Sequence, residues 1–100
     1  MQSAFVHGKT WYDKTYGNSY FSARIFVDGV EVARLPFQYG YGDQYIHEAQ
    51  RALQRLGILA PEPQPGLRLQ IEASGAVFHS VLEQSRRRDV EGWGKPWVTA

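Results

Sequence analysis

The dipeptide Asp28-Gly29 constrains the fold more than any other feature of this sequence. It separates two runs rich in β-branched and aromatic residues, FSARIFV and VEVARL. A two-residue connection of this kind predicts a type I′ turn, because both central residues need positive φ angles, which Asp and Gly tolerate. The turn sets a cross-strand register, and we expect these pairs: Val27 with Val30, Ile25 with Val32, and Ala23 with Arg34.

Alternation along the two strands divides the predicted hairpin into two faces. The face expected to meet the core holds Phe21, Ala23, Ile25, Val27, Val30 and Val32. The opposite face, which we expect to be solvated, holds Tyr20, Ser22, Arg24, Phe26, Glu31, Ala33 and Leu35. On that face Arg24 and Glu31 become diagonal neighbours, a favourable placement for opposite charges.

A second turn-prone cluster, Tyr16-Gly17-Asn18, lies between TWYDKT and NSYFSA. With the hairpin, it predicts a three-stranded antiparallel meander from about residue 9 to residue 37. Pro36 has no backbone N–H to donate, so we expect it on an edge strand or at the end of a strand.

From Asp43 the apolar period becomes helical. The apolar stripe consists of Tyr45, Ala49, Ala52, Leu53 and Leu56. Asp43 suits the N-cap and Gly57 the C′ position, so the sequence predicts a helix over about residues 44–56. The expected fold class is α+β: an antiparallel meander of three strands plus one or two C-terminal strands, packed against this one main helix.

The last 40 residues give a less uniform pattern. Residues 61–66, PEPQPG, predict a stiff connector. Residues 67–73, LRLQIEA, alternate as a strand would, yet Ser74-Gly75 equally suits the end of a short helix, so both interpretations stand. Residues 76–83, AVFHSVLE, predict a strand that joins the sheet. We expect residues 90–100 to form an irregular tail, pinned to the surface by Trp93 or Trp97.

Length and composition limit the class of protein. One hundred residues predict a single domain, 1–100, with one modest core. The chain has no cysteine, which excludes disulfides and thiolate chemistry and fits a reducing compartment, so we expect a cytoplasmic protein. Neither a signal peptide nor an apolar run of the ~20 residues that span a bilayer is evident, so we expect no membrane partner. A net charge of +1 does not call for a polyanionic partner.

Enzymatic motifs are incomplete. HEAQR, residues 47–51, starts like the two-histidine zinc motif, but Arg51 stands where the second histidine is required. His7, His47 and His79 fall in different predicted elements, and no serine lies in a G-x-S-x-G context. We therefore expect no enzymatic activity, no catalytic residue, no metal and no cofactor.

The stretch PFQYGYGDQY, residues 36–45, holds the strongest candidates for ligand contact. Gly40 and Gly42 are expected to be positive-φ hinges between strand and helix, because the third glycine of a dinucleotide fingerprint would fall at Tyr45. For Tyr39, Tyr41 and Tyr45 two interpretations stand: they pack in a core or an oligomer interface, or they stack on a planar ligand.

The second candidate group is the triplet Arg86-Arg87-Arg88. Adjacent like charges are typical of a solvated segment, but guanidinium groups also suit bidentate contact with phosphate. Alternation along an extended chain places Arg86 and Arg88 on one side and Arg87 on the other, and Asp89 is placed to orient one guanidinium. The candidate ligand-binding residues are therefore Tyr39, Tyr41, Tyr45, Arg86 and Arg88.

The order of WYDKTYGNSY, FVDGVEV and PFQYGYGDQY resembles that of small uncharacterised proteins of phage and prophage genomes. The likeness covers roughly residues 9–47 and, more loosely, 76–90, including the basic triplet followed by Asp89. The resemblance implies a phage origin and, by analogy with small phage proteins of this type, a role against host defence.

These observations lead to a ranked expectation of function. The first hypothesis is a non-enzymatic binding protein that sequesters a phosphate-bearing nucleotide signal, with the ligand enclosed between protomers of a homo-oligomer. The alternatives are an inhibitor that binds a host defence protein, a single-strand nucleic-acid binder on an exposed sheet face, and a minor virion component. Weak net charge makes the nucleic-acid alternative less favoured.

Overall fold

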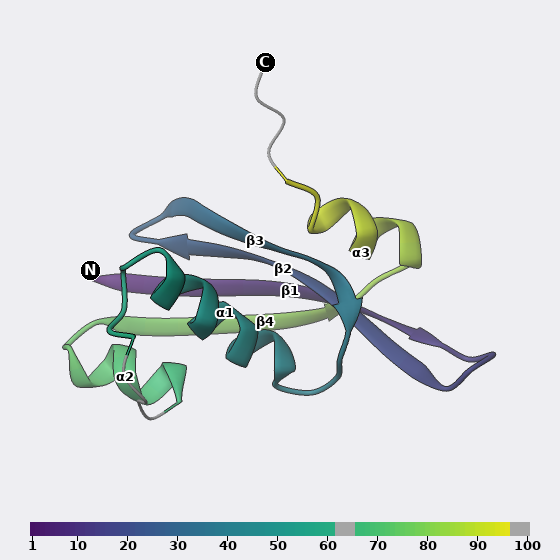
Figure 1. Cartoon of the computed structure of the whole chain (residues 1–100), viewed down its shortest axis with the longest axis horizontal. Helices are drawn as coiled ribbons and strands as arrows, with labels where there is room; N and C mark the ends of the chain where they lie inside the picture. The colour runs from purple at the N-terminus through teal and green to yellow at the C-terminus, as the bar shows by residue number, and fades with distance from the viewer. Residues whose placement is uncertain (62–65, 97–100) are drawn as a thin grey trace, which may run out of the picture.

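The computed structural model describes residues 1–61 and 66–96 and has an α+β fold. Its four-stranded sheet has the order β3-β2-β1-β4, with β1 Ser3–Asp13, β2 Asn18–Val27, β3 Val30–Tyr39 and β4 Val77–Gln84. The first three strands form the predicted antiparallel meander, which begins six residues earlier than expected, and β4 pairs parallel to β1. Three helices complete the described part of the chain: α1 Gln44–Arg55, α2 Leu67–Ala73 and α3 Arg87–Trp93 (Figure 1).

The Asp28-Gly29 turn has the predicted geometry, with positive φ at both residues (51° and 80°) and Val27 paired with Val30. Beyond this pair the predicted register is wrong. A β-bulge shifts the ladder, so that Ile25 lies opposite Ala33 and Ala23 opposite Leu35. An extra residue in one strand moves every later residue to the other face. Leu35 and Ala33, which we expected on the solvated face, therefore belong to the core side.

The β2–β3 ladder has a second irregularity between the pairs Phe21–Gln38 and Ala23–Leu35. Here one residue of β2 lies opposite two residues of β3. Pro36 lies within it, on a strand that pairs only with β2. The predicted edge position of Pro36 is thus confirmed, because a bulge on an edge strand needs no N–H from that residue.

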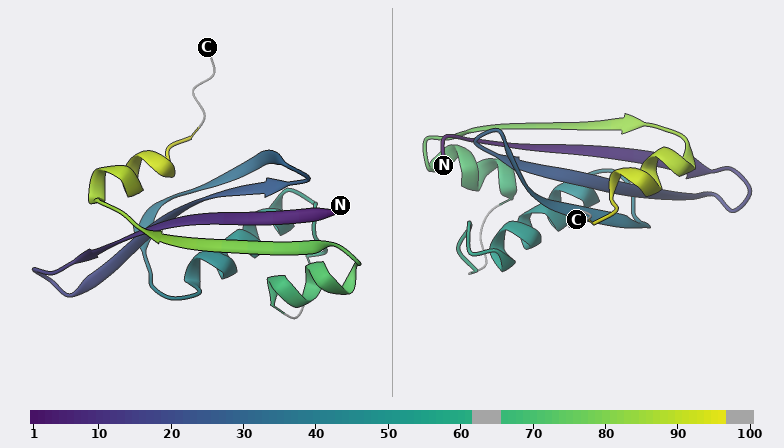
Figure 2. Two further views of the ribbon diagram at one scale, coloured as in Figure 1. Left: turned by 180° about the vertical axis from the view of Figure 1, so that it is seen from behind. Right: turned by 90° about the horizontal axis from the view of Figure 1, so that it is seen from above.

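Helices cover both faces of the sheet (Figure 2). On one face α1 packs over Val6, Ala23 and Ile25, all fully buried. On the other face α3 lies across β1, β2 and β3, and Ser22 beneath it has no exposed surface. The face that we expected to be solvated is therefore partly covered by a helix.

The predicted main helix is confirmed, with small differences at its ends. Gly57 (φ 76°) is the C′ residue, and the N–H groups of Gly57 and Ile58 donate to the carbonyls of Gln54 and Leu53 at 3.0 and 2.9 Å, a Schellman motif. Asp43 holds the N-cap position but makes no side-chain capping hydrogen bond. Leu56 is 53% exposed and is not part of the buried stripe.

Residues 67–73 form a helix, α2, which decides between the two interpretations of LRLQIEA. Its buried residues, Leu67 and Ile71, are one helical turn apart, and Gly75 follows with φ 86°. The predicted strand of residues 76–83 is confirmed as β4. Residues 62–65 of the expected stiff connector lie outside the described part. No helix within residues 1–61 and 66–96 has the length and apolar content needed to traverse a bilayer.

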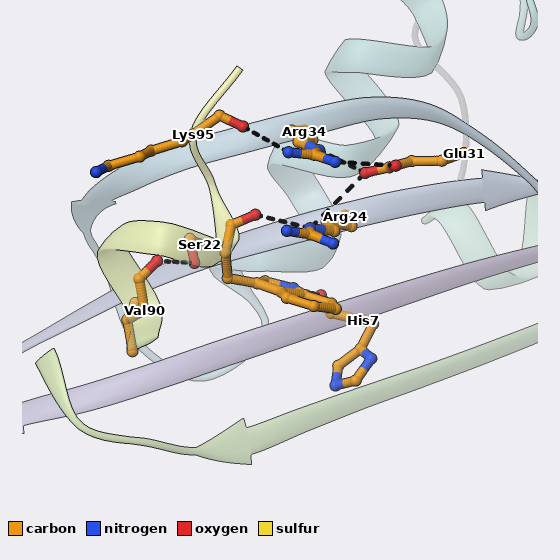
Figure 3. Close-up of polar contacts among 8 residues, drawn as sticks. His7, Ser22, Arg24, Glu31, Arg34, Val90 and Lys95 are labelled. Atoms are coloured by element: carbon orange, nitrogen blue, oxygen red, sulfur yellow. Dashed lines mark hydrogen bonds and ion pairs between the residues drawn. The ribbon is translucent and has the colours of Figure 1, made fainter. Parts of the chain in front are cut away.

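The expected irregular tail is wrong for residues 90–93, which belong to α3. Val90 is fully buried, and its carbonyl accepts a hydrogen bond from the Ser22 hydroxyl (Figure 3). The Trp93 indole donates to the carbonyl of His7 at 2.7 Å, and the Arg24 Nε donates to the carbonyl of Trp93 at 3.0 Å. The predicted pinning by Trp93 is confirmed, whereas Trp97 lies outside the described residues.

The indole ring of Trp93 also receives two cations. The Arg24 guanidinium lies 3.8 Å from the ring centroid, and the Lys9 ammonium lies 4.5 Å from it. Such contacts contribute about 0.5–2 kcal/mol each, more when the pair is shielded from water. They explain how a seven-residue helix, too short to be stable alone, stays on the sheet.

Glu31 completes this network from β3 (Figure 3). It accepts hydrogen bonds from Arg34 and forms an ion pair with Arg24 at 3.7 Å, which confirms the predicted Arg24–Glu31 neighbourhood. The hydrogen bond to Glu31 raises the pKa of Arg34, whereas burial, and then the charge of Arg34, lowers the pKa of Arg24. Arg34 in turn donates to the carbonyl of Lys95 at 2.9 Å, so the chain beyond α3 is also held.

The close approach of α3 to the sheet predicts unequal effects at its two glycines. A Cβ at Gly94 would lie 2.7 Å from Cβ of Ser22 and against the carbonyl oxygen of Leu35, whereas at Gly92 it would meet nothing within 4 Å. Gly94→Ala should destabilise the protein by about 1–3 kcal/mol. Gly92→Ala should stabilise it by up to ~1 kcal/mol, since alanine favours a helix interior. Urea unfolding measures both, and equal stabilities would contradict this packing.

The hydrogen bonds accepted by Asp28 predict that the stability of the fold depends on pH. Its carboxylate accepts hydrogen bonds from the N–H groups of Gln2 and Ser3, at 2.6 and 2.9 Å, and these lower its pKa. A lowered folded-state pKa gives stability that is present above the ordinary value of about 3.9 and is lost as pH falls through the lowered one. Asp28→Asn removes the titrating group but tolerates positive φ. Its Tm should therefore fall less than that of the wild type between about pH 5 and pH 2, and parallel Tm curves would refute the linkage.

Candidate functional site

The segment PFQYGYGDQY forms the corner between β3 and α1, and Gly40 lies at its centre. A Cβ at Gly40 would lie 2.5 Å from Cε1 of Phe21 and 2.8 Å from Cγ of Gln44. Gly40 has φ 158° and Gly42 has φ 59°, which confirms the predicted positive-φ hinges. Because the buried Phe21 ring occupies the space beside Gly40, the chain turns sharply here and carries Tyr41 outward.

The three tyrosines of this corner have different environments. Tyr39 is 61% exposed and Tyr41 is 73% exposed, whereas Tyr45 is only 6% exposed. The ring of Tyr45 lies against Gly8 of β1, where an added Cβ would be 2.8 Å from its Cδ2. Tyr45 is therefore a core residue, and its ring is not accessible to a ligand.

Tyr41 lines a cleft with a volume of about 620 Å³. We call it the hairpin cleft. Its lining residues Thr10 and Leu82 share the strand faces of the buried Val6 and Phe78, so it lies on the α1 side of the sheet. The β1–β2 hairpin, which carries part of this lining, extends past α1 (Figure 1). Lengths explain its presence: the 11 residues of β1 span about 36 Å, whereas the 12 residues of α1 span about 18 Å. One short helix leaves the far end of the strands uncovered.

Aromatic rings and one cation give the hairpin cleft its character. Tyr12, which is 57% exposed, and Tyr41 both line it, and Leu82 contributes an apolar surface. Lys14, from the turn after β1, is exposed and makes no ion pair within the described ranges. The turn itself is fixed by Asp13, whose carboxylate accepts a hydrogen bond from the N–H of Thr15 at 2.9 Å.

Small polar groups complete the lining. They come from Thr10, Ser19, Gln84 and Ser85. The Thr10 hydroxyl donates to the carbonyl of Tyr20 at 2.9 Å, so its oxygen remains as an acceptor. Of the described residues that line this cleft, none is a carboxylate or a histidine, so Lys14 supplies its only side-chain charge. The cleft can accept a planar ring beside an anionic group.

A second cleft of about 410 Å³ lies on the other side of the Gly40 corner. Tyr39 and Tyr41 both line it, together with Asp43 and His47. The structure therefore brings the two exposed candidate tyrosines to one surface. This corner cleft contains a carboxylate, however, and its described lining includes neither lysine nor arginine, so it is poorly suited to phosphate.

The predicted arginines do not meet these tyrosines. Arg86 is highly exposed and forms an ion pair with Asp89 at 3.5 Å, which confirms the orienting role expected of that aspartate. Arg88 is exposed and lines neither cleft. The predicted alternation along an extended chain is wrong, because α3 begins at Arg87.

Arg87 lies instead on the outer face of the sheet, over a row of aromatic rings. Its guanidinium carbon is 5.4 Å from the Trp11 ring centroid and 5.9 Å from that of Phe37. Tyr20 stacks between these two rings, at 5.8 Å from Trp11 and 5.1 Å from Phe37. Arg87 also pairs with Glu91 at 2.8 Å, so its contacts mainly attach α3 to the sheet.

Sequence reasoning missed Tyr12 and Lys14, although a signal was present. Tyr12 shares its strand face with Thr10, and Lys14 follows at the turn, both in the TWYDKT run used to predict the strand. The sequence does not reveal that α1 leaves this part of β1 and β2 uncovered, because that depends on the tertiary packing.

Comparisons of the chain with protein-family models, with curated protein sequences and with solved structures gave no match. Among the residues described, no group of three or more His, Asp or Glu side chains is arranged to hold a metal ion. The candidate site therefore rests on its own geometry.

The Gly40 corner generates a matched pair of variants. Gly40→Ala places a methyl group in the volume of the Phe21 ring and should destabilise the protein by about 1–3 kcal/mol. Gly42→Ala has open space around its Cβ and should cost only the ~1 kcal/mol of a left-handed backbone. Thermal unfolding compares them, and a Gly40→Ala protein as stable as Gly42→Ala would contradict the assigned contact.

Proposed function

We propose that this protein is a non-enzymatic binding protein that captures a nucleotide-type ligand in the hairpin cleft. The observation that carries this proposal is the combination of Tyr12, Tyr41 and Lys14 in one cleft lined by no carboxylate among the described residues. A volume of about 620 Å³ lies within the ~300–1,000 Å³ range of small-molecule sites.

The aromatic residues account for the base. Tyr12 and Tyr41 are largely exposed, and both line the cleft. Stacking of a base on an aromatic ring contributes about 1–3 kcal/mol. The side chains of Ser19, Gln84 and Ser85 offer hydrogen bonds to the base edge or the sugar.

Lys14 accounts for the phosphate, as a point charge without a competing ion pair in the described part of the chain. The described lining contains no histidine and no carboxylate, the side chains used most often as general acid and general base, and this favours capture over catalysis.

The resemblance to small phage proteins adds a biological context to this proposal. A binding protein of this size, made in the host cytoplasm, would act by sequestering a nucleotide signal of host defence. The absence of cysteine in the sequence fits that reducing compartment.

Thermal unfolding with a ligand panel tests the proposal. The panel contains cyclic dinucleotides, cyclic ADP-ribose, nucleoside mono- and triphosphates, and a short single-stranded oligonucleotide. A ligand present at 100 times its Kd should stabilise the protein by about 2.7 kcal/mol. An unchanged Tm across the panel would contradict the proposal. Binding of the oligonucleotide alone, with steep salt dependence, would favour the nucleic-acid alternative instead.

Matched variants locate the ligand. Tyr41→Ala should weaken binding by about 5- to 150-fold, the equivalent of ~1–3 kcal/mol of lost stacking. Lys14→Ala should weaken a phosphorylated ligand and spare its nucleoside. The controls are Tyr16→Ala, also a highly exposed tyrosine, and Lys95→Ala, which removes the same charge elsewhere. Calorimetry measures all four Kd values, and equal losses in variants and controls would place the ligand elsewhere.

A further inference from the structure

The strand β4 leaves one edge of the sheet unpaired. The N–H groups of Val77 and Ser85 donate to carbonyls of Gln2 and Thr10 at 2.9 and 2.8 Å, so the odd-numbered residues of β4 direct their backbone groups toward β1. The N–H and C=O groups of the even-numbered residues point to the opposite side. They belong to Phe78, Ser80, Leu82 and Gln84, and no described residue pairs with them.

This edge also lacks the features that protect the other one. At the β3 edge, Pro36 and two irregularities of the ladder interrupt regular pairing, as is common for edges that remain monomeric. β4 has an unbroken eight-residue ladder with β1, contains no proline, lysine or arginine, and has one acidic residue, Glu83. Regular, uninterrupted edges are templates for another strand.

Apolar side chains gather at the same edge. Val77 is 53% exposed, Val81 45% and Leu82 36%. On the outer face, Phe5 of β1 lies next to His79 in the β1–β4 ladder and stacks with Phe26 of β2 at 5.8 Å between ring centroids. Exposed apolar side chains on both faces of an unpaired edge strand favour an interaction surface over a solvated strand.

We propose that two copies of this chain associate through β4, in antiparallel register, to form one continuous eight-stranded sheet. A two-fold axis perpendicular to the sheet passes beside Val81, which lies opposite the partner's Val81. Because the backbone groups of Val81 point toward β1, this is a non-hydrogen-bonded pair, in which side chains approach most closely. The flanking residues Ser80 and Leu82 then form the hydrogen-bonded pairs.

Charge complementarity selects this register. With Val81 on the axis, His79 lies opposite the partner's Glu83, and the symmetry makes this contact twice. A register shifted by two residues would place Glu83 opposite the partner's Val77 and remove the polar contact. Within its own protomer Glu83 lies 3.2 Å from His7 and 3.7 Å from Lys9, both on β1, so its carboxylate is on the outer face but is directed toward β1. In the dimer it turns toward the edge to reach the partner's His79.

The dimer has a consequence for the hairpin cleft. Leu82 and Gln84 form the β4 side of the cleft, which is the edge of the sheet in the single protomer. A partner strand beside them extends the cleft floor, so a ligand bound there becomes more enclosed. The dimer itself is argued from the edge strand alone, whereas this consequence rests on the proposed function.

Sedimentation without added nucleotide tests the dimer. We expect the wild type to be a dimer, and Val81→Lys to be a monomer with unchanged circular dichroism, because Val81 is partly exposed. Val30→Lys is the control: Val30 is 64% exposed at the other edge, so this variant should remain dimeric. A monomeric wild type, or a Val81→Lys protein that dimerises like Val30→Lys, overturns the proposal.

Charge reversal at His79 tests the register. His79→Glu places like charges opposite each other at two symmetric positions, and should weaken dimerisation by about two- to thirtyfold. His79→Lys places a positive charge opposite the partner's Glu83 and should retain the dimer. Equal dimerisation of the two variants overturns the register. Because these measurements contain no nucleotide, failure of the dimer and failure of ligand binding are separate results.

Discussion

The contact between Gly40 and the Phe21 ring determines how the candidate site is arranged. Phe21 is a core residue of β2, and its ring fills the space that a side chain at residue 40 would occupy. Residue 40 must therefore be a glycine. At this corner β3 ends, α1 begins and the three tyrosines diverge. Tyr45 enters the core, Tyr39 stays on the edge strand, and Tyr41 turns toward the hairpin cleft.

The second determinant is the mismatch between long strands and short helices. α1 and α3 cover opposite faces of the sheet, and neither reaches the end of the β1–β2 hairpin (Figures 1 and 2). Contacts of Ser22, Arg24 and Trp93 hold α3 on the sheet, and Arg87 of α3 lies over the aromatic row beneath it. The concave surface that remains beyond α1 carries exposed tyrosines and a lysine that forms no ion pair with residues 1–61 or 66–96, so the candidate site results from incomplete coverage of the sheet.

Local signals in the sequence predicted most of the fold. The Asp28-Gly29 turn, the helical stripe from Tyr45 and the alternation of β4 each depend on neighbours within a few residues. The failures involve long-range contacts. A bulge that alternation cannot reveal shifted Leu35 into the core, and α3 forms from RRDVEGW because Val90 and Trp93 pack on the sheet. At the site, Tyr41 was recognised from its local context, whereas the roles of Tyr12 and Lys14 depend on where α1 begins to cover the sheet.

The central claim is that a nucleotide occupies the cleft beside Tyr41 and not the row beneath Arg87. Amide chemical shifts of isotope-labelled protein, followed while the most stabilising nucleotide is added, test this most directly. The account predicts that the largest changes fall on Tyr12, Lys14, Ser19, Tyr41 and Gln84, with Phe37 and Arg87 little affected. Changes concentrated on the residues around Arg87, or spread evenly over the sheet, would contradict it.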